Sequence, residues 1–308
     1  MSYTLTVKPR GKPIKSLPSE ITVPSDATAT ELYKAIAAKS RFSAHRLRIT
    51  KGSDGSAVPN ARDLSLETTG LRNQSTVYVK DLGPQIAWRT VFVVEYLGPI
   101  LIHPLLYDLR PYIYSAPAGT AFPPPSTLQT LSLCLIVLHF VKRECETLFV
   151  HRFSAATMPA RNIFKNSFHY WILAGLNIAF FTYRPSSPTQ QAPRSPALPY
   201  IGIALFVLGE LGNLSTHLTL RGLRSAGGNE RGIPTGFGFS TVTCPNYMFE
   251  IMAWTGIWLV NWSLSTGFFV LIAVAQMAVW AKKKEAKYRK EFGLKYPRKR
   301  FVMLPGLI

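Results

Sequence analysis

The pattern of apolar and polar residues divides the chain near residue 83. Before this point short apolar stretches alternate with polar residues, and after it long apolar segments follow one another. Four of the short stretches alternate like strands with one buried face, and they lie at residues 3–7, 21–23, 47–49 and 76–79. Between the second and the third, the residues SDAT at 25–28 cap a helix that includes residues 31–36.

The order of these elements is strand, strand, helix, strand, strand. This is the order of the ubiquitin-like β-grasp fold, so residues 1–82 are predicted to form a small α+β ubiquitin-like domain. We identify no acid–base pair beside an apolar pocket in this part of the sequence. We therefore interpret the domain as a docking or stability module without catalytic residues.

The long apolar segments predict a multi-pass α-helical membrane protein. A helix needs about 20 apolar residues to span a bilayer. The sequence has six segments near this length, at 87–106, 128–145, 164–182, 198–218, 247–262 and 264–281. They define a membrane core at residues 83–281 and a tail at 282–308. Because the first span follows a folded domain, we expect no N-terminal signal peptide, and the first span acts as the insertion signal.

The basic residues predict the orientation of these spans. The chain has 35 Lys and Arg against 16 Asp and Glu, a formal charge of +19. Such an excess is also typical of nucleic-acid-binding proteins, but here it gathers in the loops 142–165 and 219–246 and in the tail, whereas 107–127 and 183–197 carry few charges. By the positive-inside rule both termini face the cytosol. The tail then contacts anionic lipid or a phosphorylated cofactor, not nucleic acid.

The cysteines and histidines favour neither disulfides nor a metal site. The three cysteines, Cys134, Cys145 and Cys244, lack the spacing of a metal site and are expected to be reduced. The six histidines show no HxxxH arrangement, so a histidine-box metal centre is not expected.

Residues 209–254 carry polar side chains where an apolar helix runs into a basic stretch. Polar groups at membrane depth are costly unless they serve a site. Those of this block recur at helical spacing or begin the next apolar helix, and they are Asn213, His217, Arg221, Arg224, Asn246, Tyr247 and Glu250. Glycine pairs at Gly227–Gly228 and Gly236–Gly238 lie between the two helices. The block therefore predicts a ligand pocket at a bilayer surface.

The whole chain resembles the steroid 5α-reductase superfamily, and within it the very-long-chain trans-2,3-enoyl-CoA reductases. The resemblance rests on long motifs spread along the sequence: VEYLGP at 94–99, VKRECETLFVHRFS at 141–154, MPARNIFKN at 158–166, CPNY at 244–247 and YPRKR at 296–300. It implies the membrane fold that the apolar segments predict, and a nicotinamide cofactor.

NADPH presents a pyrophosphate and a 2′-phosphate, which guanidinium and amide groups recognise. The resemblance places Asn213, His217, Arg221, Arg224, Asn246, Glu250 and Tyr296 around this cofactor. The superfamily often has Asp at the position of His217. No GxGxxG follows a strand, so a Rossmann domain is not expected.

The resemblance also implies two catalytic residues. Glu95 lies inside the first span among aliphatic neighbours, where an acid marks a site or ties two helices together. Tyr247, in the CPNY motif, resembles the proton donor, although a Tyr at a helix start is also a common interfacial anchor. The steroid-reducing branch typically has a catalytic Tyr where this chain has Phe140, which disfavours a steroid substrate.

The implied activity is the NADPH-dependent reduction of trans-2-enoyl-CoA to saturated acyl-CoA. This is the last step of very-long-chain fatty-acid elongation, which feeds sphingolipid synthesis at the endoplasmic reticulum membrane. The implied partners are an elongase, a 3-ketoacyl-CoA reductase and a 3-hydroxyacyl-CoA dehydratase. Three alternatives remain: a 3-oxosteroid or polyprenol reductase, an enzyme similar to prenyl-cysteine methyltransferases, and a membrane scaffold without catalysis.

Overall fold

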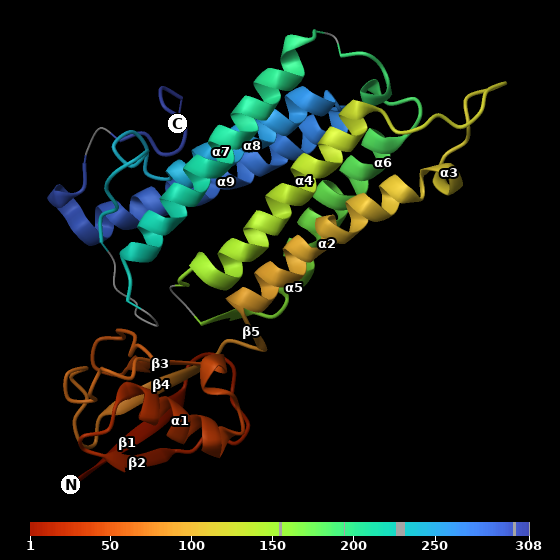
Figure 1. Ribbon diagram of the computed structural model, residues 1–308. Helices are drawn as coiled ribbons and strands as arrows, with labels where there is room; N and C mark the ends of the chain where they lie inside the picture. Colours follow the sequence, from red (N-terminus) through yellow and green to blue (C-terminus); the bar gives the residue numbers. More distant parts are fainter. Residues whose placement is uncertain (154–155, 194, 226–231, 298–299, 308) are drawn as a thin grey trace. The chain divides into compact units, whose positions relative to one another are not determined.

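The computed structural model describes residues 1–153, 156–193, 195–225, 232–297 and 300–307. The chain forms two compact units. The first comprises Met1–Trp88 and Ala156–Asn162, and the second comprises Arg89–Ala155 and Ile163–Ile308. The first is a small sheet with a helix, and the second is helical (Figure 1).

Four strands form the main sheet of the first unit. They are β1 (Ser2–Pro9), β2 (Glu20–Pro24), β3 (Leu47–Lys51) and β4 (Thr76–Asp81), in the order β2-β1-β4-β3. The central strands β1 and β4 are parallel, and the outer pairs are antiparallel. The strands coincide with the four alternating stretches of the sequence, because one side chain in two faces the core.

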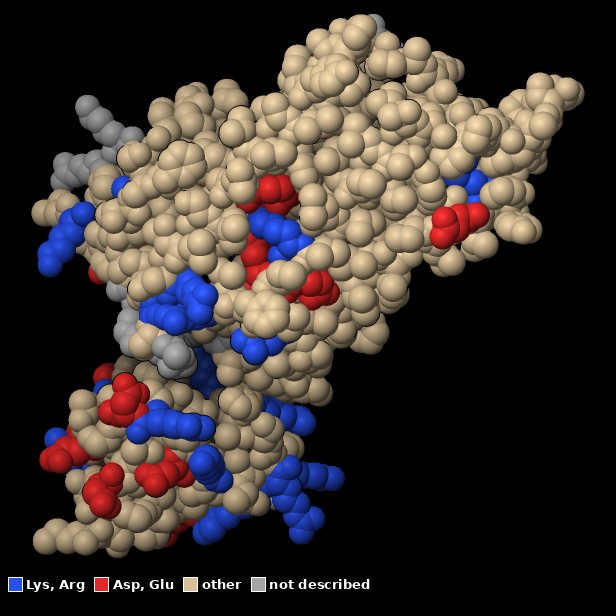
Figure 2. All heavy atoms as spheres, viewed as in Figure 1, with Lys and Arg blue, Asp and Glu red and all other residues tan. Residues whose placement is uncertain are grey.

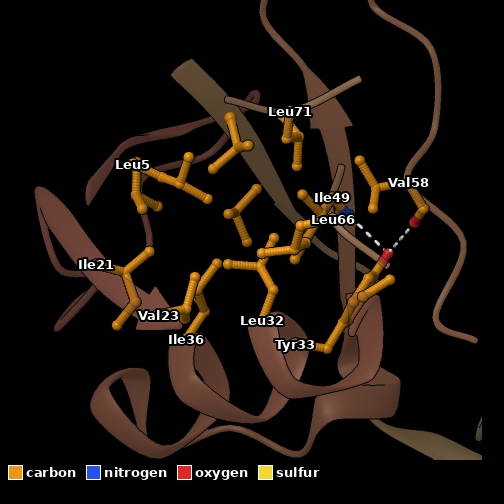
Figure 3. Close-up of a cluster of buried hydrophobic side chains, with 14 of the residues drawn as sticks. Leu5, Ile21, Val23, Leu32, Tyr33, Ile36, Ile49, Val58, Leu66 and Leu71 are labelled. Carbon is orange, nitrogen blue, oxygen red and sulfur yellow. Dashed lines mark hydrogen bonds between the residues drawn. The ribbon is translucent and has the colours of Figure 1, made fainter. Parts of the chain in front are cut away.

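Helix α1 (Ala29–Ser40) covers one face of this sheet. Its first turn is fixed by a capping box, in which the Thr28 hydroxyl accepts from the Glu31 amide while the Glu31 carboxylate accepts from Thr28. Figure 3 shows the aliphatic core between helix and strands. Within it the Tyr33 hydroxyl donates to the Val58 carbonyl at 2.9 Å and accepts from the Ile49 amide at 3.0 Å. These bonds fix the helix to β3.

Two shorter elements complete the first unit. A one-turn helix, η1 (Ala44–Arg46), precedes β3. Strand β5 (Gln85–Ala87) pairs antiparallel with β6 (Thr157–Pro159). The pairing brings together segments that are more than 70 residues apart in the sequence, and the sequence pattern did not predict it.

The second unit contains the six segments that the sequence predicts as membrane spans, each of them helical. Its elements are α2 (Trp88–Asp108), α3 (Arg110–Ile113), α4 (Thr127–Cys145), η2 (Glu146–Val150), α5 (Asn162–Ser167), η3 (Phe168–Asn177), α6 (Ile178–Tyr183), η4 (Pro188–Gln190), α7 (Ala197–Gly222), α8 (Pro245–Asn261), α9 (Leu264–Phe292) and η5 (Gly293–Lys295). Among the described residues, three helical stretches are long and apolar enough to cross a membrane: Trp88–Asp108, Ala197–Gly222 and Leu264–Lys295. These identify a helical membrane protein.

Small residues let α7 and α8 pack closely along their lengths (Figure 1). A Cβ atom added to Gly209 of α7 would lie 2.5 Å from the Ala253 backbone nitrogen and 2.7 Å from the Phe249 carbonyl oxygen of α8. Gly202 and Gly256 approach each other in the same way. Helices in membranes associate through such contacts, since lipid provides no hydrophobic driving force between them.

Replacing Gly209 with Ala is therefore expected to destabilise the helical unit by about 1–3 kcal/mol, the usual range for overpacking. The obstructing atoms belong to the backbone and cannot rotate away. Gly222→Ala is the matched control, because nothing lies within 4 Å of a Cβ added there. The thermal unfolding midpoint of the purified chain should fall for the first variant only. Equal midpoints for both would contradict the close packing of α7 and α8.

Candidate active site in the helical unit

A cluster of charged residues lies among α4, η2, α7 and α8. We call it the charged cluster, and its members are His139, Lys142, Arg143, Glu146, Glu210, Asn213, His217 and Glu250. The members on α4–η2 and those on α7 recur three or four residues apart, so each set lies on one helix face. Figure 2 shows acidic and basic side chains side by side over α4, in a surface otherwise uncharged across the middle of this unit.

Lys142 connects α4 with α7. Its ammonium group lies 2.8 Å from the Glu146 carboxylate, 3.1 Å from that of Glu210 and 2.5 Å from the side-chain oxygen of Asn213. The Lys142 side chain is 17% exposed, so the cluster reaches the surface and a ligand can approach it.

Glu146 lies at the other end of the cluster, between Arg143 and His217. Its carboxylate lies 2.6 Å from the Arg143 guanidinium and 3.0 Å from Nδ1 of His217, and the side chain is 2% exposed. Burial by itself would raise the pKa of Glu146, but the hydrogen bond with His217 and the charges of Arg143 and Lys142 outweigh it and hold the pKa below its ordinary value. Glu146 is therefore ionised at neutral pH.

His139 lies between two carboxylates. Its Nδ1 atom is 2.5 Å from Glu210, and its Nε2 atom is 3.4 Å from Glu250. Asn213 binds the same region of α8, because its side-chain nitrogen donates to the Asn246 carbonyl at 2.9 Å and to the Glu250 carboxylate at 3.1 Å. Thus the start of α8 is joined to both α4 and α7 by polar contacts.

Glu146, His151 and His217 also place three potential metal ligands within 4.8 Å of one another. Burial and the charge of Arg143 lower the pKa of His151 to about 3, which leaves its imidazole neutral. However, the Arg143 guanidinium already lies 2.6 Å from Glu146 and 3.3 Å from Nδ1 of His217. A dication would be repelled by this group, so the absence of a metal stays our prediction.

The structure places the predicted cofactor residues in three locations: the charged cluster, the end of α7 and the C-terminal tail. Asn213, His217, Asn246 and Glu250 meet in or beside the charged cluster. Arg221 and Arg224 follow at the end of α7, where Arg221 is exposed and Arg224 donates to the Arg152 carbonyl. Gly227 and Gly228 lie outside the described residues.

Tyr296 lies in a separate network at the C-terminal tail. Its side chain is 1% exposed, and its hydroxyl donates to the Glu285 carboxylate at 2.9 Å and contacts the Thr243 hydroxyl. Burial raises the pKa of Tyr296 to about 12. The tail also pairs with the loop before α8, since the Cys244 amide donates to the Val302 carbonyl at 3.0 Å. The tail network therefore contacts the chain at Thr243 and Cys244, where the CPNY motif begins.

The two predicted catalytic residues lie on different helices. Glu95 of α2 is 1% exposed. The hydroxyl of its neighbour, Tyr96, accepts from Arg143 at 3.0 Å, which connects this part of α2 to the charged cluster. Tyr247 lies in the first turn of α8, half-buried, with its ring centroid 6.4 Å from that of Trp280. Within the described residues, Glu95 and Tyr247 share no hydrogen bond.

The close approach of Trp171 explains why the VEYLGP motif has a glycine at position 98. A Cβ atom on Gly98 would lie 2.2 Å from the ring of Trp171 in η3, and the Trp171 indole donates to the Val94 carbonyl at 2.8 Å. The ring of Trp171 therefore packs directly against the turn of α2 that carries Glu95.

The sequence analysis did not assign His139, Lys142, Glu146 and Glu210 to the site. The signal that could have identified them is shared spacing: Lys142 and Glu146 are four residues apart, and Glu210 is three residues from Asn213. Two apolar helices that carry charges on one face each must turn those faces toward each other.

The fold and the cluster define a helical membrane protein with a buried, partly accessible charged site. The family model described as 3-oxo-5-alpha-steroid 4-dehydrogenase matches residues 156–308. The chain is 41% identical to a candidate enoyl reductase of Schizosaccharomyces pombe, over 98% of this chain and 99% of that protein.

Two further relatives have more specific names. One is a very-long-chain enoyl-CoA reductase of Dictyostelium discoideum, 40% identical over 92% of this chain and 93% of that protein. The other, from Caenorhabditis elegans, is named as a probable very-long-chain enoyl-CoA reductase and is 40% identical over 91% of this chain and 92% of its own length. The chain belongs to the trans-2,3-enoyl-CoA reductases of the steroid 5α-reductase superfamily.

Proposed function

We propose that the chain reduces trans-2-enoyl-CoA to saturated acyl-CoA with NADPH, as the last step of very-long-chain fatty-acid elongation. The chain is an oxidoreductase that acts on the carbon–carbon double bond of an enoyl-CoA. The observation that carries the proposal is identity of about 40% to named enoyl-CoA reductases over almost the whole chain. The acyl chain would lie among the membrane helices, and the CoA at the basic cytosolic side.

The proposed chemistry requires a proton donor and a group that holds the thioester. NADPH would supply the hydride for the β carbon. The electrons of the double bond then move onto the thioester, and Tyr247 transfers its proton to the α carbon as a general acid. Glu95 binds the thioester carbonyl or the Tyr247 oxygen. In support, one carboxyl oxygen of Glu95 is buried without a hydrogen-bond partner among the described residues, so it is available to a ligand.

The charges of the site suggest how NADPH lies. The charged cluster contains three carboxylates and two permanent cations, Lys142 and Arg143, which are already paired. A phosphate would be repelled there, whereas hydroxyl and amide groups can exchange hydrogen bonds with Asn213, His217, Asn246 and Glu250. The phosphates would instead meet Arg221 and Arg224 at the end of α7. Tyr296 would act on the cofactor site through the tail network.

Replacing Arg221 with Ala is expected to weaken NADPH binding without unfolding the chain. Arg221 is exposed, and its guanidinium forms no hydrogen bond to a buried group among the described residues. Loss of a charge-assisted hydrogen bond costs about 1.5–3 kcal/mol, or a roughly 10- to 150-fold higher Kd. Arg221→Lys keeps the charge but loses the planar guanidinium, so its Kd for NADPH should lie between those of the parental chain and of Arg221→Ala. Energy transfer from tryptophan to bound NADPH measures the Kd directly.

Arg224→Ala is expected to weaken NADPH binding too, but it also removes the bond to the Arg152 carbonyl. Its unfolding midpoint should therefore fall, whereas that of Arg221→Ala should not. Unchanged NADPH affinity in both variants would remove these residues from the site.

The substrate class can be tested against the other branch of the superfamily. Phe140, which stands where that branch has a catalytic Tyr, is fully buried between the rings of His139, Tyr170 and Trp254 and offers no hydroxyl. NADPH consumption by the purified chain should follow addition of a trans-2-enoyl-CoA and not of a 3-oxosteroid. Turnover of the steroid alone would overturn the proposed function.

We also propose a location and a topology. The chain would lie in the endoplasmic reticulum membrane with six spans and cytosolic termini, beside an elongase, a 3-ketoacyl-CoA reductase and a 3-hydroxyacyl-CoA dehydratase. Helices at all six predicted segments support the span count. The sheet order and its parallel central pair support a ubiquitin-like domain at 1–82, ahead of the core at 83–281 and the tail at 282–308. Protease protection of the tail in sealed microsomes would contradict this topology.

A further inference from the structure

In the first unit, the face of the sheet opposite α1 is basic at one end. Every second strand residue is buried against α1, so the alternate ones face solvent. At the end where β4 finishes, the exposed residues of this face are Lys8 of β1, Arg48 of β3 and Lys80 of β4. Arg10, directly after β1, donates to the Thr50 hydroxyl at 2.9 Å, so its side chain crosses the sheet on the same side. We call these four residues the basic sheet face.

The basic sheet face has a cost to stability that the fold does not offset. Arg48 and Lys80 are direct partners in the antiparallel register, and like charges directly opposite each other destabilise a sheet. Among the described residues, the ion pairs of this unit are Arg46–Asp81 and Lys51–Asp54. No carboxylate of the described part pairs with the basic sheet face.

Two other features make the face suited to a membrane surface. The amphipathic Tyr78 lies within it, opposite both Lys8 and Thr50, and tyrosines are enriched where protein meets lipid headgroups. The face also lies at the end of the unit from which the chain leaves for α2. The seven steps from Asp81 to Trp88 span at most roughly 25 Å.

We propose that the basic sheet face binds the anionic headgroups of the membrane that α2 enters. The short connection gives the face a high effective concentration at that surface. Headgroup phosphates and carboxylates would supply the counter-charges that the sheet lacks. The proposal rests on α2 crossing a membrane and is independent of the reaction proposed above. It assigns the N-terminal unit the role of a surface anchor.

The test is lysine acetylation of the full chain in lipid nanodiscs, read by mass spectrometry. In nanodiscs of phosphatidylcholine with added phosphatidylserine, Lys8 and Lys80 should react several-fold more slowly than in phosphatidylcholine alone. Lys34, exposed on the solvent side of α1, is the internal control and should react equally in both. Because the attraction is electrostatic, raised salt should remove the difference.

A charge reversal gives the matched variant. Each basic residue near an anionic surface contributes about a fivefold change in affinity, so Arg48→Glu should abolish most of the protection of Lys8 and Lys80. Lys34→Glu makes the same change of charge on the other side of the domain and should leave the protection intact. Equal rates in both nanodiscs would overturn the proposal. Rates that are equally slow in both nanodiscs would mean that a protein surface covers the face, and rates that are equally fast would mean that nothing covers it.

Discussion

Replacing Tyr247 with Phe is expected to lower the turnover of trans-2-enoyl-CoA by about 10²- to 10⁴-fold, the usual contribution of a general acid, while NADPH binds as before. The substitution keeps the ring that packs near Trp280 and removes only the hydroxyl. Tyrosine is a weak acid in water, with a pKa near 10. It can still protonate a developing enolate in a site that excludes water and stabilises the negative charge.

The matched control for this variant is Tyr288→Phe. Tyr288 is buried in the tail region, with its ring 5.5 Å from that of Tyr296, and it should keep turnover near the parental rate. The rate must be measured under conditions where chemistry limits turnover. If Tyr247→Phe then works at the parental rate, the assignment is wrong and Tyr296→Phe is the next variant to measure.

Two substitutions of Glu95 distinguish the effect of its hydrogen bonding on the same reaction from the effect of its charge. Glu95→Gln keeps a polar group of the same shape in a position that is 1% exposed, whereas Glu95→Ala leaves a gap. Turnover should fall less for Gln than for Ala if the residue binds the thioester or the Tyr247 oxygen. An equal loss in both variants would mean that the carboxylate itself is required.

The positions of helices and strands followed from the sequence because periodicity reports burial directly. The strands near residues 3–7 and 76–79 are confirmed as β1 and β4. The end of α9 was placed too early, at 281, because the apolar pattern stops there. The helix continues to Phe292 through Lys, Ala and Glu, which are strong helix formers without being apolar.

Features that depend on pairs of distant residues were not predictable from periodicity. The fit of Trp171 against Gly98 joins two helices whose contact no local pattern encodes. The same holds for Lys142, which lies between Glu146 on its own helix end and Glu210 on α7. The π-helices η2 and η3 were not predicted either, because the apolar pattern does not distinguish their wider turns from an α-helix; such turns often occur at functional sites.

Replacing Glu146 with Gln is expected to destabilise the helical unit by about 3–5 kcal/mol, the cost of removing one partner of a buried ion pair. Lys142 at 2.8 Å and Arg143 at 2.6 Å lose a common counter-charge, and His217 at 3.0 Å loses a carboxylate partner. The positive charges of Lys142 and Arg143 would then repel each other with little solvent to screen them, and His217 would lose a hydrogen-bond partner. The thermal unfolding midpoint of the purified chain should fall sharply.

Glu144→Gln is the matched control, since it makes the same change two residues away, where the described residues form no ion pair with the carboxylate. Its midpoint should change little. The double variant Glu146→Gln with Lys142→Met removes one of the two cations that Glu146 balances along with the carboxylate, so it should recover part of the lost stability. If Glu146→Gln and Glu144→Gln unfold at the same temperature, the charged cluster does not hold α4 and α7 together. The contacts of Gly202 and Gly209 with α8 would then remain as the main support of α7.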